Sequence, residues 1–541
     1  MTTGSSLTGA APAGSSPTGP SPAGPSRRAV LVNACALPLL AGFAGLARAQ
    51  SGSGLRFGPP QPFGFDWLKS EAKRLAAAPF ADPPPRAADI LDQLVYDAHN
   101  AIRFKPEMGL WAESGGPFPI QFFHLGKYFK SPVRLHTVAG GQAREILYSP
   151  DVFAFTKERW DEKLPRDIGF AGFRVMAPGG KADWLAFLGA AYFRSPGPSG
   201  QYGLSARGVA IDTAMPTAEE FPRFTQFWFA PVAGVPNAVA IYALMDGPSI
   251  TGAFRMLAAK DAGVVIDIDC ALYARKSMAR MGIAPLTSMF WYGKNSRVAD
   301  WRPQIHDSEG LALWTGTGER IWRPLNNPPA VRTSSFLDRD PKGFGLLQRD
   351  RNFENYQDDG VFYDKRPSVW VEPVGAWGEG AVQLVEIPTE EEIHDNIVAY
   401  WVPRAPAEAG SEWSFRYRLH WVDEEPYVPP LARVVATRTG LPGIPSQPRP
   451  PNRRKIVVDF EGGPVAGLSD TARGDIEVIV TAERGTVVNP FSHRVLGTKR
   501  WRAVFELAFA DRNPVDLRAY LRMDGKPLTE TWLWQYSPTP D

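Results

Sequence analysis

Cysteine is almost absent from this chain of 541 residues, which contains only Cys35 and Cys270. If the first 49 residues are an export leader, Cys270 is the one cysteine that remains, which excludes an intramolecular disulfide and a cysteine-rich metal site. Cys270 lies in the apolar run 264–270. Because burial raises the pKa of a thiol and blocks access to it, we do not expect Cys270 to be a nucleophile.

An excess of charge of one sign is also missing. The chain has 59 Lys and Arg against 57 Asp and Glu, a formal net charge of +2, and removal of residues 1–49 leaves 56 cations against 57 acids. Binding to nucleic-acid phosphates needs a basic surplus, so nucleic acid is not an expected partner. The seven histidines show no zinc-binding spacing, and the phosphate-loop, dinucleotide, GxSxG and HExxH motifs are absent. We expect no metal and no cofactor.

Long hydrophobic runs are absent too. The apolar stretch that follows Arg27 and Arg28 is short and mild, and it ends in the small-x-small pattern Ala47-Arg48-Ala49 before Gln50. These features are typical of a twin-arginine export signal, with a general secretory leader as the alternative. We therefore expect a leader at 1–49 with a low-complexity start, a periplasmic protein, and no membrane-spanning segment in the mature chain.

The remaining pattern is that of an all-β protein. Helices are predicted only at 66–78 and 86–102. Elsewhere, short apolar alternations are broken by Gly, Pro, Asn or Asp, which is typical of a β-sandwich or barrel. Predicted strands of the first part are 121–129, 144–148, 239–244, 264–272, 368–373 and 382–387. No repeat of fixed period occurs, so a propeller or solenoid is not expected.

Paired prolines near 424–430 indicate a linker between two β-domains. We predict a large β-domain at 50–422, a linker at 423–432 and a small domain at 433–541. The last part, with about seven strands in about 110 residues, fits an immunoglobulin-like sandwich. Its predicted strands are 431–437, 455–460, 476–481, 501–508, 516–523 and 531–536.

Aromatic residues make up 12% of the chain and cluster at 290–322 and 353–377 among acids and arginines. Trp and Tyr rings pack on the apolar faces of sugars, so the clusters are candidate carbohydrate sites, although a core role is the ordinary alternative. The candidates are Trp291, Tyr292, Trp301, Trp314 and Trp370. Elsewhere, Asp267 and Asp269 share one face of a predicted strand and would either chelate a cation or form ordinary hydrogen bonds.

Several long motifs resemble one known family. They are YFR at 192–194, QYGLSARG at 201–208, IDT at 211–213, MFWYG at 289–293, DWRP at 300–303, HDS at 306–308, NFENYQDDGVFY at 352–363, VEP at 371–373 and DNIV at 395–398. With these motifs the chain resembles the periplasmic glucan biosynthesis proteins G and D, and its leader favours the D branch. The resemblance implies a galactose-mutarotase-like β-sandwich followed by an immunoglobulin-like domain.

The resemblance also implies chemistry on the β-1,2-glucan backbone of osmoregulated periplasmic glucans. Family members resemble inverting endo-β-1,2-glucanases, and some relatives transfer the chain instead. By motif, Asp395 matches the general acid and Asp307 the general base, while Tyr363 and Arg366 line the cleft around the base. Because Asp395 is expected to begin a strand with apolar same-face neighbours, its pKa should be raised.

Alternatives to hydrolysis stay open at this point. They are a transglycosylase on the same glucan, a non-catalytic glucan-binding factor for a membrane synthase, and a mutarotase-like enzyme on free sugar, which rests on fold analogy alone. The implied partners are β-1,2-glucan, the inner-membrane glucan synthase and a second copy of the chain. Only an enzyme would need the carboxyl of Asp395.

Overall fold

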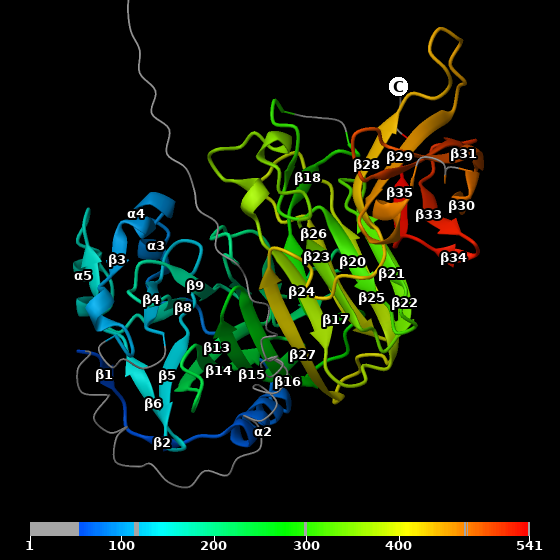
Figure 1. The fold of residues 1–541 in the computed structure, drawn as a ribbon. Helices are drawn as coiled ribbons and strands as arrows, with labels where there is room; N and C mark the ends of the chain where they lie inside the picture. Colours follow the sequence, from blue (N-terminus) through cyan, green and yellow to red (C-terminus); the bar gives the residue numbers. More distant parts are fainter. Residues whose placement is uncertain (1–53, 113–117, 297–299, 470–471, 473, 539–541) are drawn as a thin grey trace, which may run out of the picture. The chain divides into compact units, whose positions relative to one another are not determined.

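The computed structural model describes residues 54–112, 118–296, 300–469, 472 and 474–538 (Figure 1). The leader predicted at 1–49, its export route and its cleavage point lie outside these residues. Across the described ranges, no helix is long and apolar enough to cross a membrane. Strands dominate and helices are few, so the predicted all-β class is confirmed.

Two sheets form most of the chain before residue 423. The strands of the first, in order of pairing, are β6 (Gln142–Leu147), β5 (Arg134–Ala139), β13 (Arg223–Pro231), β14 (Ala238–Asp246), β15 (Ile250–Lys260), β16 (Val264–Ala274), β27 (Glu412–Val422), β24 (Ser368–Pro373), β23 (Gly343–Leu347), β20 (Gly310–Trp314) and β21 (Arg320–Pro324). The short strands β1 (Arg56–Phe57) and β2 (Gln61–Pro62) both pair with β6.

The second sheet contains β26 (Ile397–Pro403), close to whose first residue the candidate Asp395 lies. Its strands in order are β22 (Arg332–Arg339), β25 (Glu379–Glu386), β26 (Ile397–Pro403), β17 (Met281–Ser288), β11 (Ser205–Arg207), β10 (Tyr192–Arg194), β9 (Asp183–Leu188), β8 (Phe170–Met176) and β4 (Ile120–His124). β12 (Val209–Ile211) also pairs with β17. Two short pairs lie outside both sheets: β3 (Ile102–Phe104) with β7 (Phe153–Phe155), and β18 (Phe290–Tyr292) with β19 (Ile305–His306).

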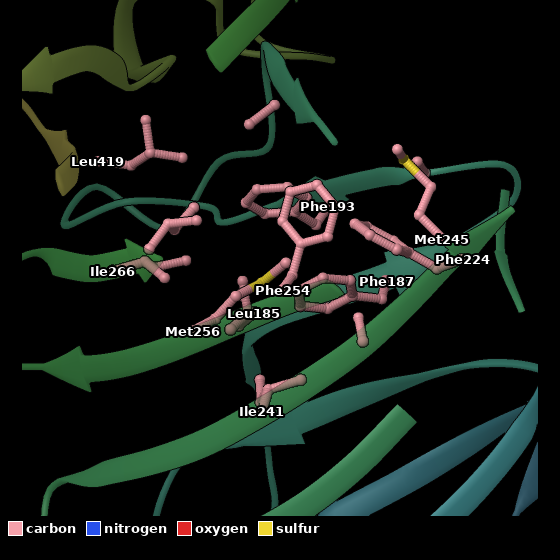
Figure 2. Close-up of a cluster of buried hydrophobic side chains, with 14 of the residues drawn as sticks. Leu185, Phe187, Phe193, Phe224, Ile241, Met245, Phe254, Met256, Ile266 and Leu419 are labelled. Carbon is pink, nitrogen blue, oxygen red and sulfur yellow. The ribbon is translucent and has the colours of Figure 1, made fainter. Parts of the chain in front are cut away.

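The two sheets pack face to face through aromatic and aliphatic side chains (Figure 2). The ring centroids of Phe187 on β9 and Phe227 on β13 lie 5.4 Å apart, and Phe224 contacts Phe254 at 5.2 Å. Both sheets contribute fully buried residues to this cluster, so apolar burial between the inner faces is the main stabilising term. The likeness to galactose mutarotase stays a prediction.

The first predicted helix is confirmed, and the second is wrong in extent. α2 (Phe65–Ala76) covers β14, β15 and β16, with Leu68 and Ala72 fully buried. In place of one helix at 86–102 there are α3 (Ala88–Leu91) and α4 (Tyr96–Asn100). The chain leaves the helix between them because Leu94 is buried and its carbonyl accepts a hydrogen bond from the Lys127 N–H at 3.1 Å. This tertiary bond competes with the helical one.

The last part of the chain forms two further layers. One sheet runs β28 (Arg433–Gly440), β29 (Arg453–Glu461), β32 (Trp501–Ala508) and β31 (Thr486–Arg494). The other runs β30 (Glu477–Ala482), β33 (Val515–Met523) and β35 (Thr531–Tyr536), with β34 (Lys526–Pro527) beside β33. The strand β31 was not predicted. β35 pairs in parallel with β21, which joins this layer to the first sheet. The domain boundaries and the immunoglobulin likeness stay predictions.

Candidate active site

Asp395 lies two residues before β26 rather than at its start, because pairing with β17 and β25 begins at Ile397. Its residue surface is accessible, yet surrounding protein atoms desolvate the carboxyl and raise its pKa, against the opposing charges of Arg194 and Arg207. Asp395 can therefore meet a ligand while holding a proton more strongly than an ordinary aspartate.

Asp307 directly follows β19 and is buried. Its backbone N–H donates to the Met289 carbonyl at 2.9 Å, and its Oδ1 lies 3.4 Å from Nε of Arg366. Burial raises the pKa of Asp307 to about 6, opposed first by Arg366 and reinforced by the charge of Asp395. The structure thus brings Asp307, Asp395 and Arg366 together.

A third carboxylate, Glu392, was missed in the sequence. Its Oε2 accepts hydrogen bonds from the Tyr363 hydroxyl at 2.8 Å and from Arg302 at 2.9 Å, and its charge raises the pKa of Asp307. Glu392 precedes Asp395 by three residues, and this short spacing was the available signal. The Tyr363 hydroxyl stays protonated, because burial and Glu392 raise its pKa.

The loop that carries Tyr363 and Arg366 is held in an unusual backbone conformation. Phe362, before the 3-10 turn Tyr363–Lys365, has φ 52°, in the left-handed region that non-glycine residues seldom occupy. Arg366 donates through its guanidinium to the Tyr202 carbonyl. A strained backbone conformation of this kind persists where the surrounding structure holds it in place. This fits a loop that fixes the positions of side chains at a site.

Gln348 joins the two loops behind the site. It is fully buried, its Oε1 lies 2.9 Å from Nδ1 of His306, and its Nε2 donates to the carbonyls of His306 at 3.2 Å and Tyr363 at 2.9 Å. The amide orientation assigns the proton to Nδ1 of His306. Burial lowers the pKa of His306 to about 4, so the ring is neutral near pH 7. One amide therefore sets the spacing between Asp307 and Tyr363.

Two of the five aromatic candidates, Tyr292 and Trp291, lie in one cluster with Tyr363. Tyr292 is buried beside it, its hydroxyl donates to the Arg302 carbonyl at 2.9 Å, and half-buried Trp291 has its ring centroid 5.2 Å from that of Tyr292. Trp301, next to Arg302 in the chain, is 72% exposed. Trp301 is therefore available for stacking, whereas Tyr292 supports the group from behind.

The other two aromatic candidates lie outside this cluster; full burial of Trp370 contradicts its predicted role, whereas that of half-buried Trp314 stays a prediction. Trp370 is fully buried in a cluster shared with strands of the last part of the chain, so a sugar cannot reach it. Trp314 contacts the same cluster and stacks with Arg320, whose guanidinium lies 3.8 Å from the ring centroid. The sequence could not separate these indoles from sugar-binding ones, because composition does not show which aromatic rings are buried.

Two other features of the sequence, the pair of aspartates and the remaining cysteine, have structural roles. Asp267 and Asp269 bind arginines of neighbouring strands, Arg418 and Arg255, each at 2.7 Å, so ion pairing replaces the chelation considered above. Cys270 is buried, and its pKa rises to about 12 through desolvation. In the described part of the chain, no group of three or more His, Cys, Asp or Glu could hold a metal ion.

The profile of the family described as "Periplasmic glucan biosynthesis protein, MdoG" matches residues 63–536. The chain belongs to this family. It is similar to "Glucans biosynthesis protein D 2" of Ralstonia nicotianae, with 50% identity over 95% of this chain and 98% of the relative. It is also similar to "Glucans biosynthesis protein D" of Xanthomonas oryzae pv. oryzae, with 47% identity over 95% and 98%, and of Stenotrophomonas maltophilia, with 48% over 90% and 92%. The resemblance read from the motifs is confirmed.

Proposed function

We propose that this periplasmic glucan biosynthesis protein is an inverting endo-hydrolase of the β-1,2-glucan backbone, exported by the twin-arginine route. One observation carries the proposal. Asp395 and Asp307 come from separate elements, both have raised pKa values, and the charge of Asp395 acts on Asp307. Hydrolysis of a glycoside with inversion needs a pair of this kind, one carboxyl protonated and one ionised.

In the proposed reaction, Asp395 donates its proton to the glycosidic oxygen as the bond from that oxygen to the anomeric carbon breaks. A water oxygen attacks the anomeric carbon from the opposite face, and Asp307 accepts the proton that this water loses. A pKa of about 6 keeps Asp307 mostly ionised at neutral pH and basic enough to accept a proton. The guanidinium of Arg366 stabilises that carboxylate.

The exposed ring of Trp301 would contact the sugar chain, and buried Tyr363 would act indirectly by holding Glu392. The Tyr363 hydroxyl is held by Glu392, and Arg302 fixes Glu392 from the other side. Trp301 is the chain neighbour of Arg302 and offers an exposed apolar ring, and an apolar face together with polar groups is the combination that a pyranose ring needs. This arrangement supports glucan binding in both the hydrolytic and the transfer reaction, and the membrane synthase and a second copy stay proposed partners.

The test uses the mature chain from Gln50 onward with linear β-1,2-glucan. Chain length, reducing ends and the anomer first formed are followed together, and inverting hydrolysis gives shorter chains, rising reducing ends and the α-anomer. Asp395→Asn and Asp307→Asn should each lower turnover by about 10²–10⁴-fold while the far-UV spectrum is kept. Redistributed chains with constant reducing ends would establish a transglycosylase, and binding without turnover a glucan-binding factor. Action on free glucose alone would favour the mutarotase-like alternative.

A further inference from the structure

A pocket of about 1070 Å³ lies between α4, β3, β4 and the ends of β8 and β10. Arg194 lines this pocket, and its charge lowers the pKa of both Asp395 and Asp307. Arg194 is thus shared by the pocket lining and the electrostatic surroundings of the candidate carboxyl pair. Its exposed aromatic residues are Tyr96, 69% accessible, and Tyr128, 66% accessible.

The lining of this pocket is strongly cationic. Its six cations are Arg103, Lys105, Lys127, Arg174, Lys181 and Arg194, and its carboxylates are Glu107 and Asp183. Over the whole chain, cations exceed acids by only two. The surplus is thus a local property of the pocket, and it is larger than the net charge of the protein.

The six cations also lack the partners that arginines elsewhere have. Within the described ranges, none of them forms an ion pair with a carboxylate, whereas Arg255 and Arg418 each pair with an aspartate on a neighbouring strand. Arg174 is instead held by the buried amide oxygen of Gln121, at 2.8 Å from Nη2. Arg194 lies over the Tyr202 ring at 4.9 Å. Concentrated positive charge without internal neutralisation favours an anionic ligand.

We infer that this pocket binds negatively charged groups carried on a sugar chain, so that the protein takes an anionic glucan in preference to a neutral one. The inference rests on the proposed function. A neutral glucan offers nothing for six cations to neutralise, whereas carboxylate or phosphate ester groups would form charge-assisted hydrogen bonds with Arg and Lys. Tyr96 and Tyr128 provide faces for the sugar rings that carry those groups.

The test compares linear β-1,2-glucan with the same glucan partly succinylated, using the mature Asp395→Asn chain so that the ligand is not consumed. Calorimetry at low salt should show about tenfold tighter binding of the succinylated glucan, and the advantage should shrink as salt screens the charges. The ratio of the two affinities is the measured quantity.

A triple variant, Arg103→Gln, Lys105→Gln and Lys181→Gln, should bring that ratio to about one. The matched control, Lys157→Gln, Lys276→Gln and Lys526→Gln, removes three exposed cations outside the pocket and should keep the ratio of the parent.

An unchanged ratio in the pocket variant, equal affinity of the parent for both glucans, or tighter binding to vesicles of anionic phospholipid than to succinylated glucan would each overturn the inference. Cleavage of neutral glucan is a separate readout. If it occurs without an anionic preference, the proposed function stands and this inference fails, whereas no binding or turnover of either glucan contradicts the proposed function.

Discussion

The side-chain amide of Asn396 makes two hydrogen bonds with the backbone of Phe290. Its Oδ1 accepts from the Phe290 N–H at 2.8 Å, and its Nδ2 donates to the Phe290 carbonyl at 3.0 Å. Phe290 pairs with His306 across β18 and β19, and Asp307 follows His306. Since Asn396 is the neighbour of Asp395, one buried amide connects the segment of the proposed acid to the segment of the proposed base.

Replacement of Asn396 by Ala should disturb both stability and turnover. It leaves the buried Phe290 N–H without an acceptor, so the free energy of unfolding should fall by about 1–3 kcal/mol. kcat should fall more than KM rises, because the spacing of the carboxyls matters most in the transition state. Asn237→Ala, which removes one exposed hydrogen bond to Lys260, is the control for stability and turnover. An unchanged kcat in Asn396→Ala would separate this amide from catalysis.

The buried carboxyl of Asp307 should lower stability at neutral pH. Its folded pKa, about 6, lies above the ordinary value of 3.8. For a raised carboxyl pKa, the stabilising contribution is complete below the unfolded pKa and is lost as pH rises through the folded pKa. Asp307→Asn should therefore gain free energy of unfolding relative to the parent, by about 3 kcal/mol more at about pH 8 than at about pH 4.

Urea unfolding of both proteins at the two pH values measures this difference. The same variant is expected to lose turnover, so stability and activity should move in opposite directions, as they do where function requires a desolvated charge. Equal differences between variant and parent at both pH values would mean that the Asp307 carboxyl is not desolvated in solution.

Two tryptophans, one exposed and one buried, distinguish sugar stacking from core packing. Trp301→Ala should weaken binding of β-1,2-glucan about 2- to 10-fold with little effect on stability, because its ring is 72% exposed. Trp370→Ala should lower the free energy of unfolding by about 3–5 kcal/mol, since the indole is fully buried and lies against Gly343. Calorimetric affinity and urea unfolding of both variants measure these effects. A selective loss of affinity in Trp370→Ala would restore its predicted role as a sugar ligand.

The sequence predicts the fold class well because the alternation of apolar and polar residues has a local cause: successive side chains of a strand point to opposite faces of the sheet. β24 (Ser368–Pro373) and β32 (Trp501–Ala508) begin and end where the pattern places them. The helix predicted at 86–102 fails because a distant N–H, that of Lys127, binds the Leu94 carbonyl, which no local pattern records.

Only those residues of the candidate site that lie in recognised motifs could be predicted from the sequence. The motifs point to Asp395, Asp307, Tyr363 and Arg366, and the structure brings Asp307 into contact or electrostatic range of the other three. Glu392 was missed because a carboxylate beside two other glutamates looks like a solvated run until its bonds are seen. The cationic pocket was missed because its six cations are spread from residue 103 to residue 194 and meet only after folding.

A buried ion network should hold the last part of the chain against the first sheet. Arg349 donates to Glu530 at 2.5 and 3.2 Å and stacks on Trp322 at 3.7 Å, and Glu530 also accepts from the Val434 N–H at 2.6 Å. Glu530→Gln would leave the buried guanidinium without its main counter-charge. The free energy of unfolding should then fall by about 3 kcal/mol, because a buried pair is broken and, among the described residues, only Glu425, 3.6 Å from Nη2 of Arg349, still faces the guanidinium as an ion-pair partner.

The control for this loss is Glu477→Gln, which breaks an exposed pair with Arg522 at 2.5 Å and should cost about 0–1 kcal/mol. Urea unfolding compares the two variants, and calorimetry with β-1,2-glucan follows affinity. Affinity per folded molecule should stay at the parental value in Glu530→Gln, since the side-chain hydrogen bonds of Glu530 go to Arg349 and to the Val434 N–H and not to Asp395 or Asp307. Equal stability losses in both variants would show that water reaches Arg349, and that apolar packing around Trp322 alone holds the two parts together.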